Sequence, residues 1–361
     1  MRTHRLSAVL LCLAVLGAAC TDGGGGADQV VTPPSPTASS EVDDAAPAAD
    51  TSAPATPPAS PSPEASPSPV EATAPATDAP RAVDVLAQRE GTDLRFTHPW
   101  EPATSAADLA ATIERTEAAA RDASLPAEER EAAGFEAQFA YRQLAETPGW
   151  FEDVLAALPE DLHAMARGNV EAREALNRLL GERDEPPTTV PAWRIVPPAP
   201  ADELVTYYRE AAEQVGVEWE YLAAINLVET RMGRIRGFST AGARGPMQFI
   251  PESWEIFGAG GDIDDERDSI FAAARHLKER DWDKGPRAAL LRYNRSSNYA
   301  DAVSAYAEVL QQDPDAYATY HGWQVLYSAG DDLFVFPVGY EEPEPVPLDE
   351  YREREVVEVA G

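Results

Sequence analysis

The chain has 361 residues, and its 62 acidic residues against 29 Lys and Arg give a formal net charge of −33. This excess of negative charge argues against nucleic acid or another polyanion as a partner. Of its two cysteines, Cys12 lies in an apolar N-terminal segment, so no pair is left for a disulfide if that segment is removed. Stability must then come from a packed core, and the length allows one or two domains.

The first 19 residues have the pattern of a secretory signal peptide. Two arginines and a histidine precede an apolar run over residues 6–19, which is too short for a comfortable membrane span. The small residues before Cys20 resemble a bacterial lipobox, in which the cysteine is lipidated; the alternative is an ordinary signal peptide with a cysteine near its cleavage site. We therefore expect residues 1–19 to be a lipoprotein signal peptide. Cys20 would anchor the protein by a lipid to the extracytoplasmic face of a cell membrane, within the cell envelope.

Residues 20–80 are built from Pro, Ala, Ser, Thr and acids, with almost nothing large and apolar to bury. Such a composition predicts a disordered tether. A tether of this length would average roughly 45 Å as a flexible coil and could reach ~180 Å when extended. The folded part of the protein could therefore act at some distance from the membrane.

Apolar residues at helical spacing follow, for example Leu109 with Ile113 and Phe135 with Phe139. With prolines at 126, 148 and 159 as breaks, they predict three or four helices between about 104 and 182, in a helical N-terminal domain over 81–185. Six prolines mark a linker over 186–201.

Residues 202–341 read as a second domain of several helices joined by glycine-containing loops. The segments WQVLY and LFVFPVGY around SAGDD predict a β-hairpin near its end. Residues 342–361 form an acidic C-terminal tail without a periodic apolar face, which we expect to be mobile.

One acidic residue, Glu229, continues an apolar stripe on the helix expected over 217–230. Leu222, Ile225 and Glu229 are spaced by three and four residues, so the carboxyl would share the buried face. Partial burial favours the neutral carboxyl and raises its pKa toward the range of a general acid. The alternative is a charge at a frayed helix end that points to water.

The segment after Glu229 carries glycines that let the backbone approach a ligand closely. The sequences ET (229–230), STAGARGPMQFIPESW (239–254) and LLRYNRSSNYADAV (290–303) resemble the catalytic core of lytic transglycosylases, which share the goose-type lysozyme fold and cleave bacterial peptidoglycan. The resemblance covers roughly residues 202–341. It implies a mainly α protein: a lysozyme-like (goose-type) catalytic domain with a small β-hairpin, preceded by a helical domain and a disordered tether.

The resemblance also implies roles for single residues. Glu229, before Thr230, matches the single catalytic carboxylate. Gln248 would hydrogen-bond the sugar beside the cut, Met247 would line the floor, and the Tyr293 hydroxyl of a Tyr293–Asn294 pair would bond the catalytic carboxyl. Ser239 matches with one extra residue after Glu229, which leaves two orientations for its hydroxyl, into the site or away. Pro246 stands where leucine is often found.

The reaction implied by the resemblance needs no cofactor and no metal. Glu229 would protonate the β-1,4 bond between N-acetylmuramic acid and N-acetylglucosamine and then take the proton of the muramic C6 hydroxyl as a 1,6-anhydro end forms. The substrate supplies its own nucleophile, so a second carboxylate is unnecessary. Two alternatives stay open. One is a lysozyme-type hydrolase in which Glu252, Asp262, Asp264 or Asp265 positions water, and the other is a non-catalytic lipoprotein that binds peptidoglycan glycan strands.

The remaining candidates are interpreted as structural. A calcium loop over residues 262–273 would need glycine at Arg267 and glutamate at Ala273, so we expect solvated loop acids there. Trp282 and Phe257 are expected in the core, Tyr293 in the cleft and His276 at the surface or a helix end. Trp254 and Tyr299 are further candidates for stacking on sugars.

Overall fold

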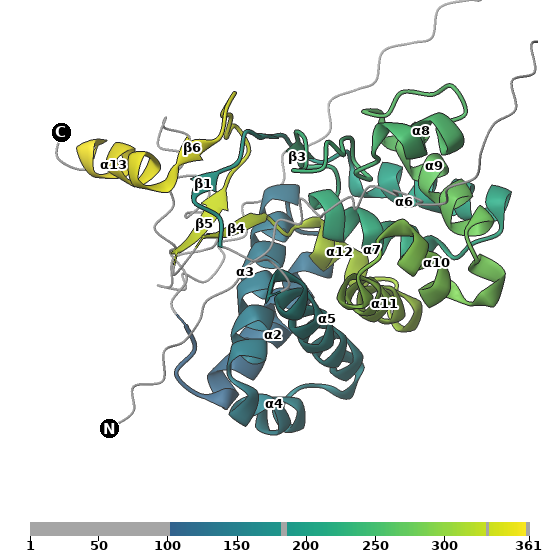
Figure 1. Ribbon diagram of the computed structural model, residues 1–361. Helices are drawn as coiled ribbons and strands as arrows, with labels where there is room; N and C mark the ends of the chain where they lie inside the picture. Colours follow the sequence, from purple (N-terminus) through teal and green to yellow (C-terminus); the bar gives the residue numbers. More distant parts are fainter. Residues whose placement is uncertain (1–101, 182–185, 330–331, 359–361) are drawn as a thin grey trace, which may run out of the picture. The chain divides into compact units, whose positions relative to one another are not determined.

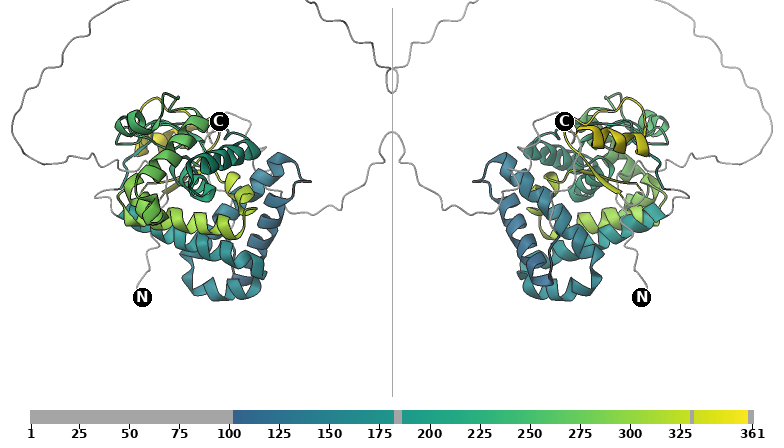
Figure 2. Two further views of the ribbon diagram at one scale, coloured as in Figure 1. Left: turned by 90° about the vertical axis from the view of Figure 1, so that its right-hand side faces the viewer. Right: turned by 90° about the vertical axis from the view of Figure 1, so that its left-hand side faces the viewer.

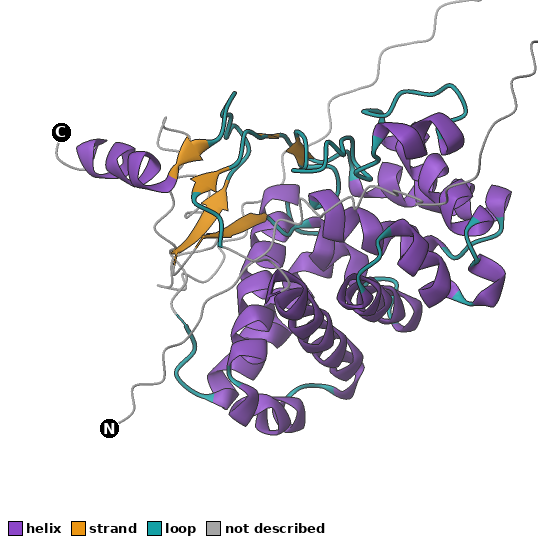
Figure 3. Ribbon diagram, viewed as in Figure 1, coloured by secondary structure: helices purple, strands orange, loops and turns teal. Residues whose placement is uncertain are grey.

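Helices dominate the structure, as predicted (Figure 3). The computed structural model describes residues 102–181, 186–329 and 332–358, all in one compact unit. The predicted signal peptide, Cys20 and the tether lie outside the described residues. No helix in the described part of the chain has the length and apolar character needed to cross a membrane.

Four α-helices make up residues 106–181, in agreement with the sequence. The first begins after Ser105, whose hydroxyl accepts the Asp108 N–H at 3.1 Å and caps the first turn. Pro126, Pro148 and Pro159 each stand at the start of an element, where a missing N–H costs no helical hydrogen bond. The elements are α2 (Ala106–Arg121), α3 (Ala127–Glu146), α4 (Phe151–Ala157) and α5 (His163–Gly181), with short 3₁₀ turns at η1 (Pro148–Trp150) and η2 (Glu160–Leu162).

A second group of helices surrounds α7, which is buried on all sides from Tyr221 onward. Every residue of α7 from Tyr221 to Thr230 is buried, as expected of a helix without a solvent face. α7 packs against α6 and α11 (Figure 1). This group comprises α6 (Ala201–Val215), α7 (Trp219–Thr230), α8 (Pro251–Phe257), α9 (Glu266–Glu279), η3 (Trp282–Lys284), α10 (Pro286–Tyr293), α11 (Ser297–Gln312) and α12 (Ala316–His321).

The two helical groups share one hydrophobic cluster. α5 lies along α11, and α3 lies against α12, and the blue and teal helices adjoin the yellow-green ones in both views of Figure 2. The contact between α3 and α12 is close: a Cβ at Gly134 would stand 2.7 Å from the Thr319 carbonyl oxygen. One continuous hydrophobic core thus spans both predicted domains. The division of the chain into two domains at residues 186–201 stays a prediction.

Buried polar contacts fasten α2 and α3 to the C-terminal elements. The Glu117 carboxylate accepts hydrogen bonds from the hydroxyls of Tyr141 at 2.9 Å and Thr319 at 2.6 Å. Gln138 and Gln324 exchange two hydrogen bonds, one through the Gln324 N–H and one through its carbonyl. Because a buried polar group is costly without a partner, these pairs specify how the segments meet.

Within the described residues, short strands form three antiparallel pairs. The predicted hairpin is confirmed, as β4 (Val325–Ala329) pairs with β5 (Asp332–Phe336). The other pairs are β1 (Thr189–Val190) with β6 (Val346–Pro347), and β2 (Arg194–Ile195) with β3 (Ile235–Arg236).

The expected linker and the expected tail are therefore partly ordered. Residues 186–201 contain β1 and β2, and residues 342–361 contain β6 and α13 (Leu348–Glu358). Their few apolar side chains, among them Trp193, Ile195 and Tyr351, are buried in a second cluster around the hairpin. Trp193 and Ile195 belong to a short apolar segment between prolines, and Tyr351 lies among charged residues, so no apolar repeat of useful length indicated their burial.

Candidate active site

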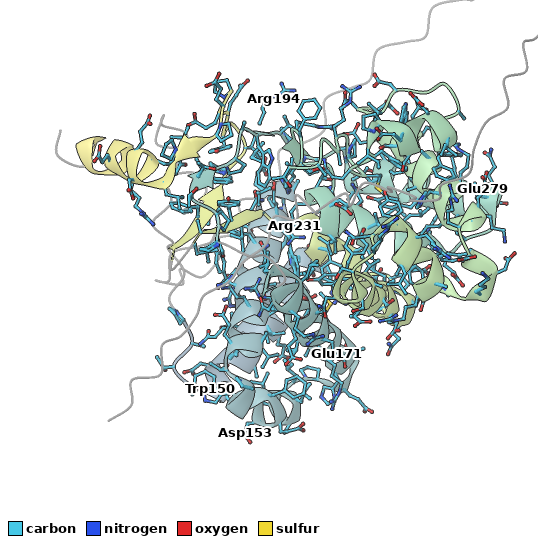
Figure 4. The ribbon with its side chains drawn as sticks, in the orientation of Figure 1. Trp150, Asp153, Glu171, Arg194, Arg231 and Glu279 are labelled. Carbon is cyan, nitrogen blue, oxygen red and sulfur yellow. The ribbon has the colours of Figure 1, made fainter. Side chains whose placement is uncertain are left out.

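α7 places Glu229 one residue before its last residue, on the buried stripe predicted from the sequence. Leu222 and Ile225 are fully buried, and the Glu229 side chain is 5% exposed. Arg231, labelled in Figure 4, ends the helix in a left-handed conformation with φ of 53°. The alternative of a solvated charge at a frayed helix end is wrong, because Glu229 is enclosed by the core.

Burial sets the protonation of this carboxyl. Desolvation raises the pKa of Glu229 to about 8, against an ordinary value of 4.5, and a hydrogen bond from Tyr299 opposes the rise. The Tyr299 hydroxyl donates to Glu229 Oε1 at 2.7 Å. At neutral pH most Glu229 side chains are therefore protonated and able to donate a proton.

Tyr299, rather than Tyr293, is the hydroxyl partner of Glu229, which corrects the sequence-based assignment. The Tyr293 hydroxyl instead donates to the Met247 carbonyl oxygen at 2.6 Å. The two rings lie parallel, with centroids 6.5 Å apart. Tyr299 is fully buried on the inner face of α11, whereas Tyr293 is partly exposed at the end of α10. A signal for Tyr299 was present in the sequence, since it heads the apolar stripe of α11 that continues with Val303.

The loop after α7 is held by its own hydrogen bonds. The Ser239 side-chain oxygen accepts the N–H groups of Ala241 at 3.2 Å and Ala243 at 3.0 Å. Of the two orientations left open by the sequence, the structure thus has the Ser239 oxygen facing its own loop. Gly245 has φ of 78°, and a Cβ there would stand 1.9 Å from the Ile263 carbonyl oxygen. Gly245 therefore lets two backbone segments of the protein approach each other closely.

A buried network attaches this loop to α7. The Pro246 carbonyl oxygen accepts hydrogen bonds from the Thr230 hydroxyl at 2.6 Å and the Asn226 amide at 2.9 Å. Asn226 in turn accepts the Tyr208 hydroxyl at 2.6 Å. Sequence reasoning missed Asn226, whose position inside an apolar helix was the available signal, because a polar residue there needs partners.

The other predicted site residues surround the same loop. Met247 is fully buried in the core, and its backbone carbonyl oxygen accepts a hydrogen bond from the Tyr293 hydroxyl. Gln248 is partly exposed with φ of 49°, a strained conformation for a residue other than glycine, and its amide donates to the Gly245 carbonyl at 3.1 Å. Asn294 follows α10, and its side-chain oxygen accepts the Ser296 N–H at 3.0 Å in the turn that leads into α11.

The alternative acids lie on the surface. Glu252, Asp262, Asp264 and Asp265 are all exposed. Asp265 caps α9 by accepting the Asp268 N–H at 2.9 Å. Within the described residues, no group of three His, Cys, Asp or Glu side chains could hold a metal ion.

The expected core aromatics are buried, and His276 requires a correction. Phe257 is 2% and Trp282 9% exposed. His276, expected at the surface or a helix end, does lie in the last turn of α9 but is 6% exposed, with its ring edge-on to Phe257 at 4.5 Å and Tyr293 at 4.9 Å. Burial lowers the pKa of His276 to about 4, so the ring is neutral at physiological pH. Its spacing of four and three residues from Ala272 and Ala273 fits a buried helical face, but the long polar residues beside it left this face ambiguous.

The fold and the site together define a mainly helical protein with one buried glutamic acid bound by a tyrosine hydroxyl. No family model matches the chain, and no solved structure matches it. Among curated proteins, the chain is similar to the membrane-bound lytic murein transglycosylase F of Thiobacillus denitrificans, with 26% identity over 151 residues. The alignment covers 38% of this chain and 31% of the relative, so the chain spans less than a third of that protein's length.

Proposed function

We propose that this protein is a peptidoglycan lytic transglycosylase that acts in cell-wall remodelling. The observation that carries the proposal is the buried Glu229, whose pKa of about 8 and hydrogen bond from Tyr299 suit a general acid at neutral pH. The motifs around it resemble the catalytic core of that family. The similarity to a protein named as a lytic murein transglycosylase supports the same substrate class.

In the proposed reaction, Glu229 acts twice. It first donates its proton to the glycosidic oxygen between N-acetylmuramic acid and N-acetylglucosamine. The resulting carboxylate is disfavoured by its buried environment, so it readily takes the proton of the muramic C6 hydroxyl as that oxygen bonds to C1. A 1,6-anhydro end forms without water, and the intramolecular attack gains in effective concentration.

The remaining predicted residues divide into two proposed roles. Gln248, partly exposed beside Gly245, is proposed to hydrogen-bond the sugar next to the cleaved bond. Ser239, Met247, Tyr293 and Asn294 are proposed to shape the sugar-binding surface, with their observed hydrogen bonds holding the loop and the start of α11 in place.

The proposed location is the outer face of a cell membrane, through a lipid on Cys20. A tether over residues 20–80 of roughly 45 Å average span would let the enzyme reach glycan strands near that membrane. The relative is named as membrane-bound, which agrees with this location.

Digestion of purified cell walls by the full chain tests the proposal. The parent is expected to cleave glycan strands, Glu229→Gln to lose cleavage by at least about a hundredfold, and the exposed-acid control Glu252→Gln to keep the parent rate. Equal rates for parent and Glu229→Gln would contradict the proposal. Binding of glycan strands by a parent that cleaves none would favour the non-catalytic lipoprotein instead, and loss of activity in Glu252→Gln would favour a hydrolase.

A further inference from the structure

The last turns of α7 carry a buried amide that no step of the proposed reaction uses. Asn226 is fully buried, and the residues from Leu222 to Ile225 before it are apolar. It stands three residues before Glu229 and four before Thr230, so all three side chains belong to the same end of the helix. A buried polar side chain is costly unless its hydrogen bonds are made, so its partners show which contacts it serves.

Both donors of this amide lead to one backbone oxygen of the loop after α7. Asn226 Nδ2 donates to the Pro246 carbonyl oxygen at 2.9 Å and to the Thr230 hydroxyl oxygen at 3.2 Å. That hydroxyl donates to the same Pro246 oxygen at 2.6 Å. On its other side, Asn226 Oδ1 accepts the Tyr208 hydroxyl of α6 at 2.6 Å. A buried network whose members all have partners holds a single arrangement of its groups.

The Pro246 carbonyl has one bond more than its burial requires. A buried carbonyl oxygen is satisfied by a single donor, which the Thr230 hydroxyl supplies. The second donor, from Asn226, comes from a position about one helical turn earlier on α7. Two donors from different positions fix the direction of the carbonyl, and with it the peptide unit between Pro246 and Met247. Asn226 therefore orients this backbone as well as bonding to it.

The oriented peptide unit leads directly into a strained residue, Gln248. Its φ of 49° is unfavourable for a residue other than glycine and persists only where the surroundings impose it. Contacts on its N-terminal side do so: α7 holds the Pro246 carbonyl, and the Met247 carbonyl oxygen accepts the Tyr293 hydroxyl at 2.6 Å. The Gln248 N–H closes the turn on the Gly245 carbonyl at 3.0 Å. Loss of the contact with α7 would therefore let this turn relax.

We propose that Asn226 is a positioning residue that holds Gln248, through the Pro246 carbonyl, in place to bond the sugar next to the cleaved bond. The inference rests on the proposed function for the sugar contact of Gln248. It adds that α7 sets the position of both the acid and the sugar-binding turn, because Asn226 and Glu229 share this helix. Among the hydrogen bonds of the described residues, none joins Asn226 to Glu229 or Tyr299, so its loss should leave the ionisation of Glu229 unchanged.

Kinetics of the full chain on soluble glycan strands separate this role from a general loss of structure. Asn226→Leu keeps a branched side chain but removes both donors. It is expected to raise KM at least about tenfold, with a smaller change in kcat and an unmoved alkaline limb of the pH profile of kcat, which reports Glu229. The matched control is Asn169→Leu, since Asn169 is 2% exposed on α5 and donates within its own helix, to the Met165 carbonyl at 2.8 Å. This control should keep the parent KM. An equal KM in the two variants, or a moved alkaline limb in Asn226→Leu, would overturn the proposal.

Amide hydrogen exchange tests the same contact without any substrate. In Asn226→Leu the Gln248 N–H, which closes the turn on Gly245, should exchange at least about tenfold faster than in Asn169→Leu. Faster exchange together with a parent that cleaves no glycan strands would support Asn226 as the residue that holds the turn and would contradict the proposed function alone. Equal exchange in the two variants would overturn the role of Asn226, whatever the parent cleaves. If Asn226→Leu does not fold, Asn226→Ser, whose side chain is one bond shorter, is measured instead with the same expected results.

Discussion

Replacing Glu229 with glutamine is expected to remove activity and to stabilise the protein, more so as the pH rises. Glutamine has nearly the same shape, and its side-chain oxygen can still accept the Tyr299 hydroxyl, but it has no proton to lose. The parent must either keep Glu229 protonated or hold a carboxylate in a site that is 5% exposed. The difference in the free energy of unfolding between the two proteins therefore reports the ionisation of Glu229.

The sign and the size of this effect follow from the pKa values. Glu229 has a pKa of about 8 in the folded chain and an ordinary value of 4.5 when unfolded. Between these values the folded state binds more protons, so its stability is fully present below pH 4.5 and declines as the pH rises toward 8. At about 1.4 kcal/mol per pKa unit, the loss is about 3 kcal/mol at pH 7 and at most about 5 kcal/mol above pH 8. Glu229→Gln should avoid this loss.

Urea unfolding of parent and Glu229→Gln at pH 5, 7 and 9 measures the effect. The two proteins should have similar stability at pH 5 and diverge in favour of the variant at higher pH. Glu252→Gln, an exposed change on α8, should show no such divergence. A stability difference between parent and Glu229→Gln that stays constant from pH 5 to pH 9 would refute the burial-driven pKa of Glu229.

Three further predictions use the same structure. Tyr299→Phe removes the bond that lowers the Glu229 pKa, so the alkaline limb of the pH profile of kcat should move up by about one unit, and an unmoved limb would contradict that contact. Gly245→Ala should lower the free energy of unfolding by about 2–4 kcal/mol, because its Cβ would overlap the Ile263 carbonyl. The control Gly242→Ala also changes a left-handed glycine but has open space around its Cβ, so it should lower the free energy of unfolding by about 1–2 kcal/mol. Equal losses in urea unfolding would argue against the overlap. Cys20→Ser should move the protein from the membrane fraction to the soluble fraction, and retention in the membrane would contradict lipidation at Cys20.

The helices and the hairpin could be predicted because their apolar residues repeat at regular spacing. Leu109 with Ile113 and Phe135 with Phe139 indicated helices that the structure contains, all four side chains being buried. The strands and the helix found in residues 186–201 and 342–358 could not be predicted from regular apolar spacing. Trp193 and Tyr351 are buried by partners that are distant in sequence, around the hairpin, and long-range packing leaves no local periodicity.

The site was predictable where a residue follows the helical repeat and not where tertiary contacts decide. Glu229 continues the stripe of Leu222 and Ile225, and its expected burial is found, although every residue of α7 from Tyr221 to Thr230 is buried and not this stripe alone. The choice between Tyr293 and Tyr299 as its partner depends on how α10 and α11 pack, and the motif alone favoured the wrong hydroxyl. The attachment of Pro246 to Thr230 likewise joins residues that no spacing rule relates.

The helices of residues 106–181 pack against the helices that position the proposed site. They cover α11 and α12, and their buried polar groups, such as Glu117 and Gln138, meet partners on the C-terminal elements. α11 carries Tyr299, so this packing supports the hydroxyl that binds Glu229. The N-terminal helices thereby contribute to the position of the proposed acid.

In the proposed reaction, Glu229 drives an intramolecular attack within the sugar rather than attack by water. Mass spectrometry of the fragments released from purified peptidoglycan distinguishes the two reactions. The parent is expected to release fragments lighter by one water than the hydrolysis products, with 1,6-anhydro ends that resist borohydride reduction, and Glu229→Gln is expected to release none. Fragments with reducible ends and the full mass of hydrolysis products would contradict the proposed reaction.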